Sequence, residues 1–196
     1  LQAMQERHVT VAGERHDMPE PFHVLATQNP IEQEGTYPLP EAQLDRFLLQ
    51  IDVPYPDQDA ERQMLLATTG AVTAEVPRVL SAGELMEAQK LIRKMPVGES
   101  VLEAILSVVR QGRPGEGSDA AITEQVAWGP GPRASQALML AVRARALLDG
   151  RLAPSIDDVV TLARPVLQHR MALTFAARVD GITIDDVVAR LTDPIT

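Results

Sequence analysis

The first quarter of the chain places short apolar runs between turns, a pattern typical of strands separated by loops. Residues 22–26 form one such run between a proline and a polar cluster, and residues 48–53 form another. Their lengths favour strands of a sheet, the first of them buried on both faces. Upstream, the extended stretches on either side of Gly13 predict a hairpin. We therefore predict a mixed α/β region from residue 1 to about residue 53.

Beyond residue 54 the apolar positions recur every three or four residues, which is the period of an amphipathic helix. The pattern predicts helices over residues 58–69, 99–110 and 133–149, and another that stops before Pro96. We expect the helix over 133–149 to bury one stripe of aliphatic side chains: Ala137, Leu140, Ala141, Ala144, Leu147 and Leu148.

Three helix starts carry recognisable capping chemistry. Residues 81–84 have the capping-box pattern, in which a Ser and a Glu side chain bond each other's backbone N–H groups. Residues 155–160 and 183–188 are nearly identical, each with a hydroxyl residue followed by two aspartates in the first turn. Such acids suit the helix dipole. We interpret the likeness as reused capping chemistry, not as a repeat of a larger unit.

Two domains are expected from these patterns. Residues 1–75 would form part of an α/β core, and residues 76–196 would form an all-helical lid. The stretch from Gly70 to about residue 77 is the predicted hinge between them.

Three polar residues stand where a phosphate could be recognised. Asn29 follows the predicted strand 22–26, and open α/β sheets bind ligands beyond the carboxyl ends of their strands. Arg46 ends a short helix opened at residue 40, and a guanidinium is permanently charged and binds phosphate bidentately. Arg133 begins a helix after a Gly-Pro-Gly-Pro segment, and helix N-termini attract anions.

Each of the three also has a simpler interpretation. Asn29 could only start a turn before a proline. Arg46 could only pair with Glu41 or Asp45, and a surface ion pair is worth ~1 kcal/mol or less. Arg133 could be a solvated arginine in a flexible loop.

The wider sequence around these residues favours the functional interpretation. Ala-Thr-Gln-Asn-Pro at 26–30 and Leu-Asp-Arg-Phe at 44–47 resemble the sensor 1 and arginine-finger motifs of the MoxR family of AAA+ ATPases. Residues 2–11 resemble the helix and hairpin that precede sensor 1 in that family. Residues 129–135 resemble its sensor 2 motif, and residues 166–170 resemble the close of its lid. The likeness covers residue 1 to about residue 170.

This resemblance implies a fold and roles for single residues. The fold would be α/β: the C-terminal portion of a P-loop AAA+ core, with parallel strands and a hairpin, followed by a helical lid. Asn29 would hold the attacking water or contact the γ-phosphate, Arg46 would reach the nucleotide of a neighbouring subunit, and Arg133 would couple nucleotide to lid position. Gly131 departs from the serine that is common in the motif. His169 and Arg170 resemble a recurrent pair, for which we expect a structural role.

The resemblance also implies a reaction and partners. The protein would bind ATP with Mg²⁺ and hydrolyse it at the subunit interfaces of a homo-oligomeric ring, expected to be a hexamer. Lid motion would drive chaperone-like remodelling or maturation of partner proteins. In this family the partners are often proteins with a von Willebrand factor A domain.

Two motifs of a complete ATPase do not occur in the sequence. No Gly-x-x-x-x-Gly-Lys-[Ser/Thr] loop is present to cradle phosphates, and no apolar run ends in the Asp-Glu pair that holds magnesium. The chain begins with a leucine inside a predicted helix. We therefore expect it to be the C-terminal part of a longer protein, inactive alone, whose nucleotide and metal are bound mainly by residues outside this sequence.

Composition limits the classes of function. Of the 196 residues 45% are hydrophobic but only 3% are aromatic, so an aliphatic core is expected. The net charge of −9, from 27 acidic and 18 basic residues, argues against a nucleic-acid-binding surface. Cysteine is absent and the four histidines lack metal-ligand spacing, so no metal site is predicted. No stretch could insert into a membrane, and a cytoplasmic location is expected.

Two alternatives remain open at this point. The chain could be a non-catalytic interaction or assembly module, which its acidic charge and missing phosphate loop favour. It could also belong to a motor subunit similar to that of magnesium chelatase, whose sensor and finger motifs are alike.

Overall fold

The computed structural model describes residues 2–28, 39–70, 76–115 and 118–195. The elements of its first part are α1 (Gln2–Glu6), β1 (His8–Val11), β2 (Glu14–Asp17), α2 (Glu41–Leu44), α3 (Gln58–Thr69) and α4 (Ala82–Lys94). Those of its second part are α5 (Glu99–Gln111), α6 (Ala120–Gln125), β3 (Val126–Trp128), α7 (Pro132–Leu148), α8 (Ile156–Leu167), η2 (Gln168–Arg170), β4 (Ala172–Leu173), α9 (Phe175–Val179), α10 (Ile184–Thr192) and η3 (Asp193–Ile195).

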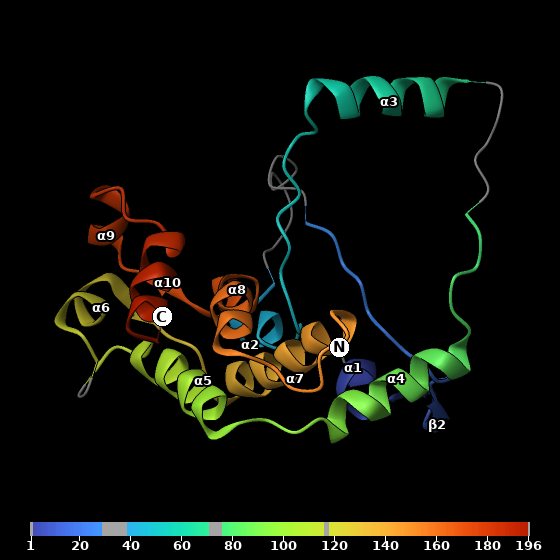
Figure 1. Ribbon diagram of the computed structural model, residues 1–196, viewed down its shortest axis with the longest axis horizontal. Coiled ribbons are helices and arrows are strands. Elements are labelled where there is room, and N and C mark those ends of the chain that lie inside the picture. The colour runs from blue at the N-terminus through green and yellow to red at the C-terminus, as the bar shows by residue number, and fades with distance from the viewer. Residues whose placement is uncertain (1, 29–38, 71–75, 116–117, 196) are drawn as a thin grey trace.

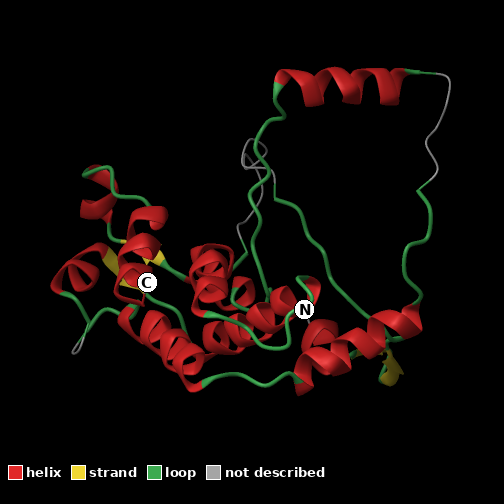
Figure 2. Cartoon of the chain, viewed as in Figure 1, coloured by secondary structure: helices red, strands yellow, loops and turns green. Residues whose placement is uncertain are grey.

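Helices dominate the molecule, and the second half forms its packed body (Figures 1 and 2). Helices α5, α7, α8 and α10 enclose one aliphatic core, to which α6 and β3 also contribute. Along the described chain Met95 is the first buried residue. The described residues before Met95 thus form no buried core of their own, and the later part of the chain is the part that folds by burying apolar surface.

The predicted hairpin is present. Strands β1 and β2 pair antiparallel, with His8 opposite Asp17 and Val11 opposite Glu14. Gly13 turns the chain between them with φ +88°, a value that favours glycine because it lacks a Cβ.

The strands predicted at residues 22–26 and 48–53 are not formed. Both segments run without strand pairing, and Leu25 and Val53 are 96% and 89% exposed. A strand needs a neighbour for its backbone groups. Within the described residues the only sheets are the two-stranded pairs β1–β2 and β3–β4. Most apolar side chains of these two segments are therefore exposed in the described structure, although Leu49 packs against the core.

The predicted helices agree closely with the observed ones, and α3 spans the predicted residues. Figure 1 shows α3 apart from the other helices, and none of its residues is buried. The helix expected after residue 40 is short, because α2 covers only four residues. All three capping boxes form, at Ser81, Ser155 and Thr183. No helix among the described residues is long and apolar enough to cross a bilayer.

The stripe predicted for α7 is partly wrong. Its buried residues are Ala134, Ala137, Leu138, Ala141, Val142 and Ala146. Leu148 is 87% exposed, while Leu140 and Ala144 line a cleft beside α4. Helix α7 packs against α5 and α8 on one side and α4 on another, so its apolar surface is wider than the one stripe that periodicity suggested.

Candidate functional site

Arg46 lies one residue beyond the C-cap of α2. Its backbone N–H donates to the carbonyl of Gln43 (3.2 Å), and its side chain is half-buried. The simpler interpretation, an ion pair with Glu41 or Asp45, is not observed: the Arg46 guanidinium makes no hydrogen bond or ion pair with any residue that the structure describes. Its positive charge is therefore unpaired within the described residues.

Arg133 occupies the first turn of α7, immediately after Pro132 at the first helical position. The loop before it is held firmly. A Cβ at Gly129 would lie 2.2 Å from the carbonyl oxygen of Gly112, so only glycine permits this approach. Arg113 Nε donates to the carbonyl of Pro130 (2.9 Å). The loop before Arg133 thus makes specific contacts with residues 112 and 113, whereas the Arg133 side chain itself is 43% exposed.

The N-cap of α7 explains why Gly131 can replace a serine. Gly131 has extended backbone angles, φ −81° and ψ −178°, which any residue adopts. No atom lies within 4 Å of where its Cβ would be. A serine would fit there, so the departure from the family motif does not alter the loop. With glycine, no side chain caps the first N–H groups of this 17-residue helix.

Asp45, the residue before Arg46, binds two arginines of the lid. Its Oδ2 lies 3.3 Å from Nη1 of Arg133, and its Oδ1 accepts from Nε of Arg170 (3.0 Å). The carboxylate that precedes Arg46 is thus bound by the arginine that begins α7 and by one in η2. This role of Asp45 was not predicted from the sequence. Its place inside the finger motif, beside a permanent cation, was the available signal.

Arg170 is the buried member of this cluster, with 2% of its side chain exposed. Besides Asp45, it donates to the carbonyls of Phe47, Leu48 and Val166. Burial lowers the pKa of Arg170, and the charge of Asp45 opposes that shift. Arginine tolerates such a position because its planar fork supplies five donors, most of which find acceptors here.

His169 contacts the same segment from the lid. Its Nε2 lies 3.2 Å from the carbonyl oxygen of Phe47, and its Nδ1 is buried without a hydrogen-bond partner. Burial and the nearby charge of Arg170 lower its pKa to about 4. The ring is therefore neutral at physiological pH and acts as a structural group. Sequence analysis predicted a structural role, and the contacts reach beyond the lid to the segment that follows Arg46.

Further bonds continue along the chain in register. Gln50 donates its N–H to the carbonyl of Pro165 (2.8 Å), and its own carbonyl accepts from Nε2 of Gln168 (2.8 Å). Arg164 binds Asp52 (2.8 Å). One of these acceptors, the carbonyl of Pro165, lies in the last turn of α8, where carbonyls have no partner within the helix. We call residues 45–52, with these bonds, the finger mount; it is fixed to the end of α8 and to η2.

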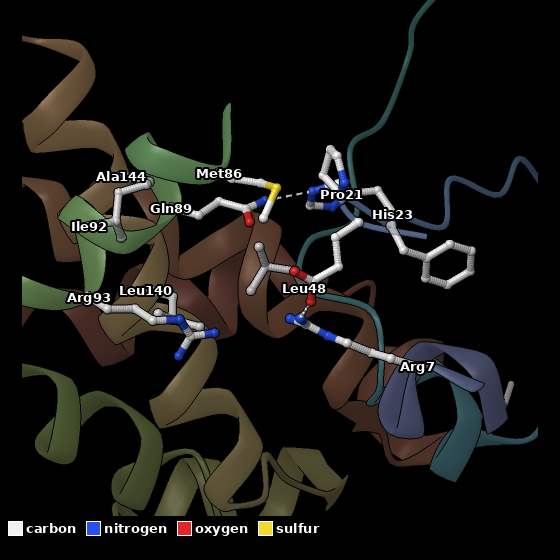
Figure 3. Close-up of a pocket in the computed structure, with 12 residues that line it drawn as sticks. Arg7, Pro21, His23, Leu48, Met86, Gln89, Ile92, Arg93, Leu140 and Ala144 are labelled. Atoms are coloured by element: carbon white, nitrogen blue, oxygen red, sulfur yellow. Dashed lines mark hydrogen bonds and ion pairs between the residues drawn. The ribbon is translucent and has the colours of Figure 1, made fainter. Parts of the chain in front are cut away.

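Asn29, the third predicted site residue, lies outside the described residues, so its prediction remains untested. A cleft of about 300 Å³ lies between the N-terminal segment and helices α4 and α7 (Figure 3). Gln89 and His23 contact each other across it at 2.8 Å, and Arg7 pairs with Glu20 at its edge (2.6 Å). This cleft contains none of the predicted site residues.

The surroundings of Arg133 fit an anion. The residue is 43% exposed, stands at an uncapped helix start and already binds a carboxylate. Backbone N–H groups and a guanidinium at such a start are the usual means of holding phosphate. For a divalent metal, the described residues contain no group of three acidic or histidine side chains that could hold one.

Comparison with known proteins gives two family models that match separate parts of the chain. The model described as "ATPase family associated with various cellular activities (AAA)" matches residues 1–49. The model of the AAA lid domain matches residues 118–191. The finger mount begins inside the first matched region and extends three residues past its end, and Arg133 lies inside the second.

Similar proteins come from several bacteria. "Chaperone MoxR1" of Mycobacterium tuberculosis is 40% identical over 97% of this chain and 51% of its own length. "Protein MoxR" of Paracoccus denitrificans is 32% identical over 89% of this chain and 55% of its own. A crystal structure from Cytophaga hutchinsonii, of a protein provisionally named an ATPase, is 32% identical with a TM-score of 0.90. It covers 97% of this chain, which covers 58% of that one.

The chain therefore spans about half the length of the curated relatives it matches. Both family models, the named relatives and the similar crystal structure agree on one assignment. The chain belongs to the MoxR family of AAA+ ATPases and corresponds to its C-terminal part, the end of the AAA+ core followed by the helical lid.

Proposed function

We propose that this protein contributes the arginine finger and the sensing lid of a MoxR-type ATPase that hydrolyses ATP, with Mg²⁺, between the subunits of a ring. The ring is expected to be a hexamer, and its action on partner proteins chaperone-like, with von Willebrand factor A domain proteins as candidate partners. The name of the Mycobacterium tuberculosis relative supports the chaperone-like role. The cytoplasm is the compartment we expect.

One observation carries this proposal. Arg46 keeps its charge free of every described partner, although Asp45 beside it binds two other arginines. A free, half-buried guanidinium on a segment fixed by several hydrogen bonds is suited to meet charge supplied by another molecule. Arg46 would stabilise charge that develops on the transferred phosphoryl group of a neighbouring subunit. Arg133 would read the phosphates in its own subunit, and Asn29 would position the attacking water.

The experiment uses the full-length protein and the substitution Arg46→Ala. Because an arginine finger contributes roughly 10³- to 10⁵-fold in rate, turnover should nearly vanish while nucleotide binding is largely retained. Phosphate release measures turnover, and calorimetric titration with a non-hydrolysable ATP analogue measures binding. Arg178→Ala is the matched control, because Arg178 is an exposed arginine on α9.

Mixing subunits tests whether Arg46 acts between them. Subunits with a disabled phosphate loop but an intact Arg46 are mixed with Arg46→Ala subunits, which keep their phosphate loop. Where the two kinds meet, one type of interface has both a working phosphate loop and an Arg46. Partial recovery of turnover is expected. If rings shown by mass spectrometry to be mixed recover none, the assignment of Arg46 to the neighbouring site fails. If the unmodified full-length protein neither binds ATP nor turns it over, a non-catalytic assembly module becomes the better description.

A further inference from the structure

Asp45 binds two arginines that differ in their exposure and in the number of their other hydrogen-bond partners. Arg170 is 2% exposed and donates to three backbone carbonyls of the finger mount in addition to the carboxylate. Arg133 is 43% exposed, and its bond to Asp45 is 3.3 Å long. The described residues give the Arg133 guanidinium no other partner. Arg170 is therefore a permanent partner of Asp45, whereas Arg133 can leave.

The position of Arg133 favours transfer of its guanidinium from Asp45 to a phosphate. It lies at the uncapped start of α7, where backbone N–H groups and the helix dipole favour an anion. A phosphate group carries more charge than a carboxylate and offers more acceptor oxygens. When phosphate reaches this helix start, Asp45 and phosphate compete for the same guanidinium. Asp45 loses little, because Arg170 still neutralises it.

We propose that Asp45 is a resting acceptor for Arg133, an internal anion that holds this arginine when no nucleotide is bound and that phosphate must displace. The proposal rests on the proposed function, since it requires Arg133 to bind nucleotide. In this role Asp45 is a positioning residue. It holds the Arg133 guanidinium at the C-cap of α2, and it lowers nucleotide affinity by the free energy of the pair.

The consequence is a specific coupling between two residues. Asp45→Asn keeps the size of the side chain and removes its charge, so Arg133 should be free to bind phosphate. An ion pair this exposed is weak, so nucleotide should bind about two- to fivefold more tightly. The gain should require Arg133. In the Arg133→Gln background, Asp45→Asn should change affinity by less than about 1.5-fold, because no arginine remains to be released.

The experiment measures the dissociation constant of a non-hydrolysable ATP analogue for the full-length protein, by calorimetry. Four proteins complete the cycle: the unmodified protein, Asp45→Asn, Arg133→Gln and the double variant. Asp52→Asn is the matched control, because Asp52 is an acid of the same finger mount that pairs with Arg164 instead. It should leave affinity unchanged, which separates release of Arg133 from a general loss of negative charge.

The outcomes are distinguishable. Equal gains from Asp45→Asn with and without Arg133 would overturn the inference while leaving the proposed ATPase intact. No binding by the unmodified protein would overturn both. If Asp45→Asn loses its cooperative thermal transition, Asp45→Glu keeps a charge for Arg170 while moving the carboxylate by one methylene. The same cycle then applies, and a change in affinity that disappears with Arg133→Gln supports the inference, whereas an additive change refutes it.

Discussion

At the scale of single residues, the contact between lid and finger mount depends on two polar side chains that are buried for different reasons. Arg170 is charged and finds acceptors for its donors. His169 is neutral because burial disfavours its charged form, and one of its ring nitrogens has no hydrogen-bond partner. A buried arginine stays protonated and must therefore be paired, whereas a buried histidine can lose its proton.

The pH dependence of stability should report His169. Its pKa is about 4 in the folded protein against an ordinary value of 6.5, so below pH 6.5 the unfolded chain binds a proton that the folded chain refuses. Stability from this group is complete above pH 6.5 and is lost as the pH falls towards 4. Between pH 7.5 and pH 5 the loss should be about 2 kcal/mol. Urea unfolding of the chain at both pH values measures it.

His169→Gln is the matched variant, because glutamine can still donate to the carbonyl of Phe47 but does not titrate. Several carboxylates with lowered pKa, among them Asp158 and Asp186, also lose stability in acid. They are present in both proteins, so the difference between the two proteins isolates His169. Equal losses on acidification would show that His169 is not held neutral by its surroundings.

At the scale of elements, α8 and α10 begin with the same chemistry in different surroundings. Both have a capping box with aspartate at the third helical position. Asp186 is exposed, and within the described chain its carboxylate accepts hydrogen bonds only from its own N-cap residue, Thr183. Asp158 is 3% exposed and also accepts two bonds of 2.7 Å from Arg151. Nearly identical sequence therefore performs a local role in one helix and a tertiary role in the other.

This pair gives a controlled comparison of two substitutions. Asp186→Asn removes part of a solvated cap and should cost about 0.5–1 kcal/mol in unfolding free energy. Asp158→Asn leaves Arg151 without its buried carboxylate and should cost about 2–4 kcal/mol. Chemical denaturation of both variants measures the two costs. Equal costs would mean that capping alone accounts for both aspartates.

The elements that could be predicted from sequence are those whose signals are local. Capping residues and apolar period identified α3, α4, α5 and the twin starts of α8 and α10, because each helix satisfies its own backbone. The strands expected at 22–26 and 48–53 failed for the opposite reason: a strand depends on neighbours that a local pattern cannot specify. Strands β3 and β4, of three and two residues, are too short to leave a pattern.

The candidate site divides in the same way. Arg46 and Arg133 could be named from motifs, since each lies in a short and specific run. The partners of Asp45 could not, because Arg133 and Arg170 lie 88 and 125 positions from it and meet it only through folding. The roles of Arg46 and Arg133 remain proposals that the experiments above test.

At the scale of the whole molecule, the proposed finger residue Arg46 lies outside the part of the chain that holds the buried core. The buried core belongs to the lid, whereas none of the described residues before Met95 is buried. The sequence has no phosphate loop. Nucleotide chemistry therefore requires groups that this chain does not contain, although it carries two of the arginines proposed to act on the nucleotide.

The 196-residue chain should accordingly release no phosphate from ATP above a buffer control, because nothing in it cradles the α- and β-phosphates. A malachite-green assay of the purified chain with magnesium and ATP measures this, with the full-length protein as the active comparison. Arg46→Ala in the isolated chain identifies any contaminating ATPase, since its activity would be unchanged by the substitution. Turnover that persists through purification and disappears in this variant would refute the prediction.

The hydrogen bonds that hold the finger mount determine how its sequence can vary. Arg170, His169, Gln168 and Pro165 bond backbone carbonyls and one backbone N–H of residues 45–50. The lid thus recognises the path of this backbone more than the identity of its side chains. At position 50 most residues preserve the attachment, but proline cannot, since it lacks the N–H that Pro165 accepts. The side chains of such a segment can be substituted during evolution while its backbone continues to present an arginine from the same place.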